Sequence, residues 1–408
     1  MTIQVPSPRL AAMIDAKRGP MIGNLAAYAH ANTLTRLFPD LYAGLDVVSR
    51  ELVGFVPSVT RNATAERAAV GQSVVYHVTP AANVVDITPA MQVPNPADQS
   101  VGNDTITITK SKAAEFGFTG EEQRGLNYGP GYLSVQADMF AQGLRALCNL
   151  VEADLALAAQ LGASRATGTA GTTPFASGVG DSAQLRKILD DNGAPASGRS
   201  MIINTASGAN LRTNTQLTKA NESGQTMTLR DGTLIDMHGF MIKESGQAVN
   251  ATKGTGASYT TDTAGYAVGA TSITLITGTG TIKAGDVVTF AGDTNKYVVK
   301  TALTGGVIVL ANPGLRVAIP ASATAVTVGN SYSANVGFSS NALVLAARQP
   351  ALPQEGDLAL DRMPLTDPRS GLTFEVALYP GYRKIRAEVA LAWGTKVTKS
   401  EHIGLLLG

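Results

Sequence analysis

Few residues in this sequence have the types and spacing that catalysis or metal binding requires. The four histidines, at positions 30, 77, 238 and 402, lie far apart, and no His-Glu-x-x-His pattern is present. Cys148 is the only cysteine, which excludes intrachain disulfides and cysteine-cluster metal sites. The phosphate-binding pattern Gly-x-x-x-x-Gly-Lys-Ser/Thr and the nucleophile elbow Gly-x-Ser-x-Gly are both absent. We therefore predict no catalytic residue, no metal site, no cofactor and no enzyme activity.

The adjacent carboxylates and the single thiol are explained more simply by structural roles than by catalysis. Asp190-Asp191 and Glu121-Glu122 are neighbours in sequence, and such neighbours do not face each other on a helix. We interpret both pairs as solvated helix ends. Cys148 lies beside an apolar helical stripe, with no basic neighbour that would activate it. A buried thiol is the expected outcome.

Three basic residues remain as candidates for contacts with another subunit. Lys110 and Lys112 lie beside an alternating Ile-Thr strand, and Arg124 follows later in the same region. Two interpretations stay open. These side chains contact an acidic surface of a neighbouring subunit, or the lysines protect an exposed strand edge from unwanted pairing.

The composition favours a protein that assembles. Charged residues make up 15% of the 408 residues, against about 25% in an average soluble domain, and the formal net charge is +1. A chain so close to neutrality is prone to self-association, and it lacks the overall positive charge that is typical of nucleic-acid-binding proteins. The sequence shows no signal peptide and no apolar run of about 18 residues. We expect a cytosolic product that does not span a membrane.

A long helix over residues 133–161 is the clearest predicted element. Apolar residues recur there at three- and four-residue steps, and at 1.5 Å per residue the helix would span about 40 Å. Pro130, Gly131 and Gly162 mark its ends. The opposite stripe is polar and consists of Asp138, Gln142, Arg145, Asn149 and Glu152. The apolar stripe needs one broad partner surface.

Residues 51–125 predict a long two-stranded excursion. One strand lies in the run around 74–78, and the other in 104–110, where threonines and isoleucines alternate between two faces. Prolines at 80, 89, 94 and 96 discourage regular pairing between them. Because two strands alone are marginally stable, something outside the excursion must support it.

The middle of the chain alternates helix and strand. A helix over 183–192, capped by Asp181 or Ser182, precedes a buried strand at 199–205, after which Thr205 caps a short helix. The Asp231-Gly232 pair is a hairpin signal.

Beyond residue 248 the composition changes. Residues 249–335 are rich in Thr, Gly, Ala and Val, and predict an inserted β domain, a small sandwich or barrel. Its four predicted strands are 272–276, 286–290, 296–300 and 306–310, and three further strands are predicted at 341–348, 372–380 and 385–393.

The order of these parts resembles the major capsid (coat) protein of tailed bacteriophages, with the HK-ninety-seven-type (Johnson) fold of the P-twenty-two-like group. GDVVTFAG at 285–292 is the most family-like string. The resemblance implies an α+β capsid fold with an inserted small β-barrel. It divides the chain into an N-terminal arm (1–50), an extended β loop (51–125), a peripheral domain with the spine helix (126–225), an axial domain (226–248 and 336–408) and the inserted domain (249–335).

The resemblance also implies a function. Many copies would assemble into hexamers and pentamers of an icosahedral shell around a double-stranded DNA genome. The implied partners are other copies of the chain, a scaffolding protein, a portal and, weakly and without sequence preference, the packaged DNA. The product would reside in the virion after assembly in the bacterial cytoplasm. The alternative is a β-rich virion or surface attachment protein that binds glycans, which fits 249–335 better than it fits the long helix.

Overall fold

The computed structural model describes residues 53–62, 66–78, 89, 102–127, 132–218, 234, 236–367 and 371–408. The predicted N-terminal arm at 1–50, the Asp231-Gly232 turn, the Pro130-Gly131 pair and nearly all of the tip between the two excursion strands lie outside these residues. The described chain is an α+β structure with two large sheets and one two-stranded sheet.

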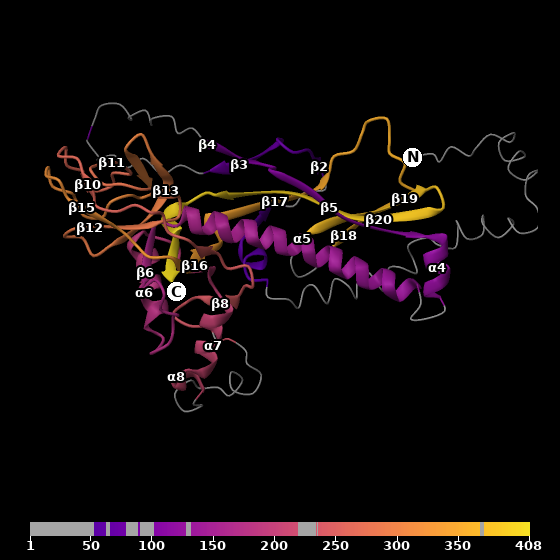
Figure 1. Cartoon of the computed structure of the whole chain (residues 1–408), viewed down its shortest axis with the longest axis horizontal. Helices are drawn as coiled ribbons and strands as arrows, with labels where there is room; N and C mark the ends of the chain where they lie inside the picture. The colour runs from indigo at the N-terminus through magenta and orange to yellow at the C-terminus, as the bar shows by residue number, and fades with distance from the viewer. Residues whose placement is uncertain are drawn as a thin grey trace, which may run out of the picture.

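A seven-stranded sheet lies over one long helix, α5 (Tyr132–Gly162). In Figure 1, α5 runs along the length of this sheet. The central strand, β20, pairs with β5 along one edge and with β19 and β17 along the other. The strands are β1 (Thr60–Asn62), β2 (Arg67–Ala68), β5 (Lys110–Thr119), β17 (Leu343–Pro350), β18 (Asp361–Thr366), β19 (Thr373–Gly381) and β20 (Lys384–Val397).

The helix is buried along the stripe that its periodicity predicts. Its fully or nearly fully buried apolar residues include Phe140, Leu144, Leu147, Val151 and Leu155. Cys148 is also buried, as expected. One residue of the opposite polar stripe is buried as well, because Glu152 has no exposed surface. It is buried because it binds backbone that packs onto the helix from far away in the sequence.

A second sheet of twelve strands carries the smaller helices on it. Its body part consists of β6 (Arg165–Gly168), β7 (Arg199–Ile203), β8 (Met241–Glu244), β9 (Asn250–Ala251), β16 (Tyr332–Ser339) and β21 (Ile403–Leu407). The helices are α6 (Gly180–Asp191), α7 (Thr205–Thr213) and α8 (Thr215–Thr218). Elsewhere in the described ranges, 3₁₀ turns occur at η1 (Val56–Ser58), η2 (Ser340–Ala342) and η3 (Ser400–His402).

The predicted inserted β domain is present and closes on itself. Its strands are β10 (Tyr259–Thr261), β11 (Ser272–Ile276), β12 (Val287–Phe290), β13 (Lys296–Thr304), β14 (Val307–Leu310) and β15 (Ala325–Val328). They pair in the order β12-β15-β10-β11-β14-β13, and β13 pairs back to β12, which forms a small barrel. It has its own apolar core and joins the body where β13 pairs with β6.

Two predicted helix caps are wrong. Asn204, not Thr205, caps α7, because its side-chain oxygen accepts the backbone N–H of Ser207 at 2.8 Å. At the start of α6, neither Asp181 nor Ser182 is the cap; the residue there is Val179, with no side-chain cap. Other partners occupy those two side chains. Asp181 accepts the N–H of nearby Phe175, and the Ser182 hydroxyl bonds to the Val179 carbonyl and lies 2.7 Å from Nδ1 of the distant His238.

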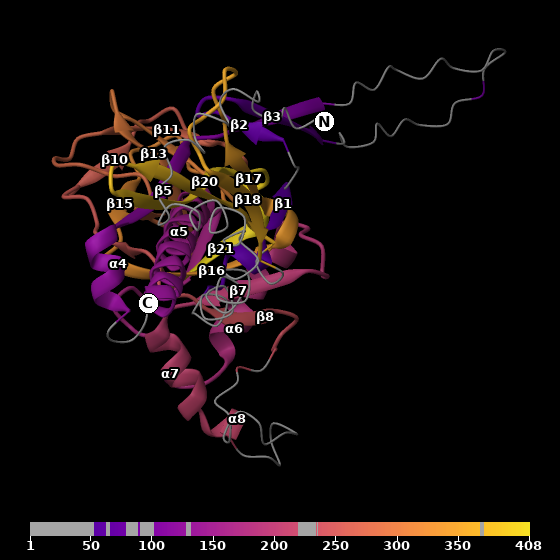
Figure 2. The ribbon, with the colours of Figure 1, turned by 90° about the vertical axis from the view of Figure 1, so that its right-hand side faces the viewer.

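The predicted excursion is a separate two-stranded sheet of β3 (Ser73–Val78) and β4 (Gly102–Thr107). Figure 2 shows this pair at the outer margin of the molecule. As predicted, Ile106 and Ile108 share the buried face. They pack against β2, β17 and β20 through Ala68, Val344, Ala346 and Ala392. The body sheet is therefore the external support that two lone strands require.

Candidate assembly surfaces

The described residues carry no obvious site for chemistry. Within the described ranges, no group of three or more His, Cys, Asp or Glu side chains could hold a metal ion. The helices of that same part of the chain include none long and apolar enough to cross a membrane. The informative polar groups instead hold the N-terminal part of the described chain to the body.

The first of these groups is the Glu152 anchor, in which one carboxylate on α5 binds the backbone of residues 54–56. The N–H groups of Gly54 and Phe55 donate to Oε1 at 2.6 and 2.8 Å, and the N–H of Val56 donates to Oε2 at 3.0 Å. The hydroxyl of Ser245 adds a further hydrogen bond. Burial raises the pKa of Glu152 above its ordinary range, against the opposing effect of these hydrogen bonds.

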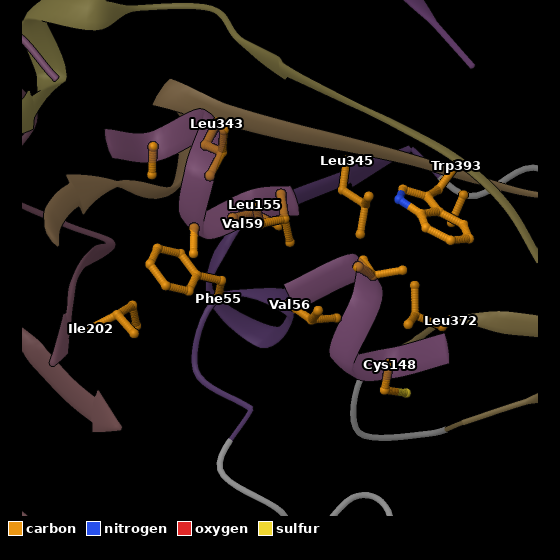
Figure 3. Close-up of a cluster of buried hydrophobic side chains, with 14 of the residues drawn as sticks. Phe55, Val56, Val59, Cys148, Leu155, Ile202, Leu343, Leu345, Leu372 and Trp393 are labelled. Carbon is orange, nitrogen blue, oxygen red and sulfur yellow. The ribbon is translucent and has the colours of Figure 1, made fainter. Parts of the chain in front are cut away.

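Side-chain packing holds the same segment in place. Phe55 and Val56 insert into the main core beside Leu155 and Leu343, as Figure 3 shows. The ring of Phe55 stacks on Phe338 with 6.0 Å between the centroids. A Cβ at position 54 would lie 2.8 Å from a methyl of Ile202 and 2.9 Å from the Glu244 carbonyl, so this close approach requires glycine. The anchor and this packing together hold residues 54–56 on the body.

The second group is the Asp104 latch, which ties the β3–β4 pair to β20. Lys396 forms an ion pair with Asp104 and donates to the Thr105 carbonyl at 2.8 Å. The hydroxyl of Tyr76 donates to Asp104 Oδ2 at 2.5 Å, and the Lys396 ammonium lies 5.9 Å from the Tyr76 ring centroid. The Lys396 and Tyr76 bonds lower the pKa of Asp104 to about 2. Burial, together with Asp104, raises the pKa of Tyr76.

The three predicted contact residues are not brought together. Lys110 begins β5 and pairs within the chain with Asp154 Oδ1 at 2.6 Å. Lys112 is exposed on the same strand, and Arg124 is exposed on α4 (Gly120–Leu126) beyond the far end of β5. Among the described residues, neither Lys112 nor Arg124 has an ion-pair partner. Ten strand residues span roughly 30 Å, so Lys110 and Arg124 mark opposite ends of one edge strand.

Sequence reasoning missed the residues that do the holding. The sequence pattern assigns Glu152 to a polar helix face, and it assigns Asp104 to an alternating strand. Nothing near either position in sequence points to its partner, since Glu152 binds residues 96–98 positions away and Lys396 lies 292 positions from Asp104. The one available signal is Gly54, where a close backbone approach calls for glycine.

The comparisons find similarity in solved structures only. No protein-family model matches the sequence, and no curated protein matches it. The chain is similar to the capsid of cyanophage P-SCSP1u, with 12% identity, 86% of each chain covered and a TM-score of 0.47. It is similar to the mature capsid of bacteriophage PhiM1, with 11% identity, 86% of each chain covered and a TM-score of 0.43.

A third similar structure is a virus-like particle from Pyrococcus furiosus. The identity is 12%, the match covers 91% of this chain and 99% of that chain, and the TM-score is 0.42.

Proposed function

We propose that this chain is the major capsid protein of a tailed bacteriophage, and that it self-assembles into an icosahedral shell of hexamers and pentamers around a double-stranded DNA genome. The observation that carries the proposal is the β3–β4 pair. It forms a sheet of its own at the margin of the molecule, supported along one face by the body. Its inner face is packed on the body, while its outer face carries exposed side chains such as Val75, so the pair is placed to contact a neighbour.

Exposed apolar side chains support the same conclusion. Val70 and Val75, in and beside the β3–β4 pair, are 59% and 56% exposed, and Leu358, Leu360 and Tyr382 exceed 60%. In a chain with only 15% charged residues, these side chains are the natural sites for contacts between copies. Among the described strands β5 pairs with β20 alone, so its other edge offers a further contact surface.

The two anchoring groups support an assembly role in different ways. The buried Glu152 anchor holds residues 54–56 rigidly, and α5 stiffens the sheet above it. The Asp104 latch is partly exposed and can open at small cost, which lets the polar side of the β3–β4 pair adjust while Ile106 and Ile108 stay packed on the body. Such adjustment is required where one surface must serve several quasi-equivalent positions in a closed shell.

The proposal extends to partners, location and parts. A scaffolding protein and a portal would take part in assembly, the packaged DNA would be contacted weakly, and the product would reside in the virion after assembly in the host cytoplasm. The role is structural and not enzymatic. We keep the division into arm (1–50), extended loop (51–125), peripheral (126–225), axial (226–248 and 336–408) and inserted (249–335) parts, with the inserted barrel of the P-twenty-two-like group.

Among the predicted contact residues, Lys112 and Arg124 are the better candidates for acidic partners on a neighbouring subunit. Both are exposed and lack an ion pair within the described part of the chain. A contact through Lys110 would have to compete with its existing pair to Asp154.

Negative-stain electron microscopy of the purified chain, alongside gel filtration, tests the proposal. We expect shells, tubes or ring-shaped capsomers, first for the chain alone over a concentration series and then with its scaffolding protein. A chain that stays monomeric or forms a slender trimer under both conditions would overturn the proposal. Glycan binding would then be the next property to measure.

A further inference from the structure

The loop between β17 and β18, residues 351–360, presents two leucines to solvent. Leu358 is 84% exposed and Leu360 is 66% exposed, far more than apolar residues of this size usually are in a folded chain. In Figure 1 the loop rises above the seven-stranded sheet, on the side away from α5. We name Leu358 and Leu360 the leucine knob.

The base of the knob is braced by a charged network. Arg362 pairs with Asp357, and Tyr379 donates to the same carboxylate at 2.8 Å. Arg362 also pairs with Glu375 at 3.1 Å, which in turn pairs with Arg67. The backbone N–H of Leu360 donates to the Leu378 carbonyl at 2.7 Å. The two leucines are therefore held outward by their surroundings.

A groove of about 800 Å³ lies elsewhere on the same chain. The end of β5, the start of α4 and the β19–β20 turn form its walls, and Phe118 and Ile385 are its apolar lining. Tyr382, at 92% exposure, stands at its rim. The volume falls within the range of about 300–1,000 Å³ that binding pockets have, which is enough room for two leucine side chains.

The charges around the knob and the groove are complementary. Glu355 is an exposed acid on the knob loop. Of the three charged residues that line the groove, Arg383 and Lys384 are cationic and Glu121 is anionic. Arg383, Lys384 and Glu355 have no ion-pair partner among the described residues. Complementary potentials of this kind select a partner and fix its register.

We propose that the leucine knob of one subunit docks into the groove of a second copy of this chain, with Glu355 facing Arg383 and Lys384. The proposal rests on the proposed function, since it concerns a contact within the shell. Knob and groove are different surfaces, so the contact is head-to-tail and generates rings when the rotation closes. Both lie toward the end of the molecule opposite the inserted barrel (Figure 1), and the contact therefore joins subunits at that end.

Charged substitutions on the knob provide the first test. The double variant L358D/L360D should fold like the wild type, because both side chains are exposed, but should need at least a tenfold higher concentration to assemble. The matched control is V268D, which charges a 62% exposed valine on the inserted domain and should assemble normally. Wild-type assembly by L358D/L360D would overturn the contact.

A cysteine pair provides the second test and reads out the contact directly. In assembled L358C/Y382C particles, oxidation with diamide should link knob to groove and give a ladder of covalent oligomers on a denaturing gel. The control V268C/Y382C should give none, and Cys148 is buried and should not interfere. Assembled L358C/Y382C particles without a ladder would overturn the contact.

The two proposals fail in distinguishable ways. If the wild-type chain never assembles, the proposed function falls, and the knob contact falls with it. If the wild type forms shells but the knob variants assemble equally well and do not cross-link, only the knob contact falls.

Discussion

Two carboxylates hold the first described part of the chain to the body, and they do so in opposite environments. Glu152 has no exposed surface and accepts three backbone N–H groups. Asp104 has 39% of its side chain exposed and is held by Lys396 and Tyr76. Burial raises the pKa of Glu152, whereas the ion pair lowers that of Asp104 to about 2.

The difference shows that a carboxylate holds its segment firmly when it is buried and loosely when it is exposed. We call the two the Glu152 and Asp104 joints. Removing a buried acceptor leaves several backbone donors without water or protein partners, at about 1–3 kcal/mol for each. An exposed ion pair contributes only about 0–1 kcal/mol, because water and salt replace it readily. We expect residues 54–56 to be held firmly by Glu152, and the polar side of the β3–β4 pair to be held loosely by Asp104.

The largest expected effect is that of Glu152→Ala. Three buried N–H groups would lose their acceptor, so the free energy of unfolding should fall by about 3–5 kcal/mol. Urea unfolding followed by the fluorescence of Trp393, the only tryptophan, would measure it. The control is Asp138→Ala, an exposed position on the same helix, which should stay within about 0.5 kcal/mol of the wild type.

Glu152→Gln separates the charge from the shape of the anchor. The amide keeps one carbonyl oxygen for two N–H donors but turns an NH₂ group toward the third, so we expect a loss of about 1–3 kcal/mol. The same urea titration reports it. A variant as stable as the wild type at neutral pH would show that the carboxylate contributes no more than a neutral side chain.

The two joints should respond to pH with opposite signs. The pKa of Asp104 is lowered from 3.8 to about 2, so its contribution to stability is present above pH 3.8 and is lost as the pH falls through 2. The pKa of Glu152 is raised from 4.5, so the part of its contribution that depends on protonation is complete below pH 4.5 and is lost as the pH rises through the raised value, while its backbone hydrogen bonds remain. Urea midpoints against pH, with Asp104→Asn and Glu152→Gln as references, would measure both slopes. Slopes of the same sign would contradict the comparison.

The smallest effect on stability is expected from Asp104→Asn. Its ion pair with Lys396 is partly exposed, so the loss should stay below about 1 kcal/mol. Hydrogen exchange of the amides in β3 and β4 should nevertheless rise, while residues 54–56 stay as protected as in the wild type. Glu115→Gln, which removes the exposed pair to Arg386 elsewhere on the sheet, is the control and should leave β3 and β4 unchanged. Unchanged exchange in Asp104→Asn would show that the latch does not hold the pair.

Much of the fold follows from local pattern. The three- and four-residue spacing of Phe140, Leu144 and Leu147 predicts α5, and the alternation at Ile106 and Ile108 predicts which face of β4 is buried. The change of composition after residue 248 predicts the inserted domain. Each of these signals lies within a few residues of the element it predicts.

The helix caps and the site depended on contacts that local pattern does not contain. Ser182 has the right chemistry for a cap, but its hydroxyl lies against Nδ1 of His238, 56 residues away. Lys110 looks like a residue that protects a strand edge, yet it pairs with Asp154 on α5. The leucine knob looks like ordinary loop sequence until burial is known for each residue.

The sequence by itself determined the elements, the inserted domain and the absence of recognisable catalytic motifs, because periodicity, turn residues and motif spacing act over short distances along the chain. Only the tertiary structure decided that Glu152 is an anchor, that Asp104 meets Lys396, and that a leucine knob and a groove occur on one molecule. Those pairings bring together residues far apart in sequence. Whether a carboxylate or a leucine is buried sets its energetic role, and burial is decided only when the chain folds.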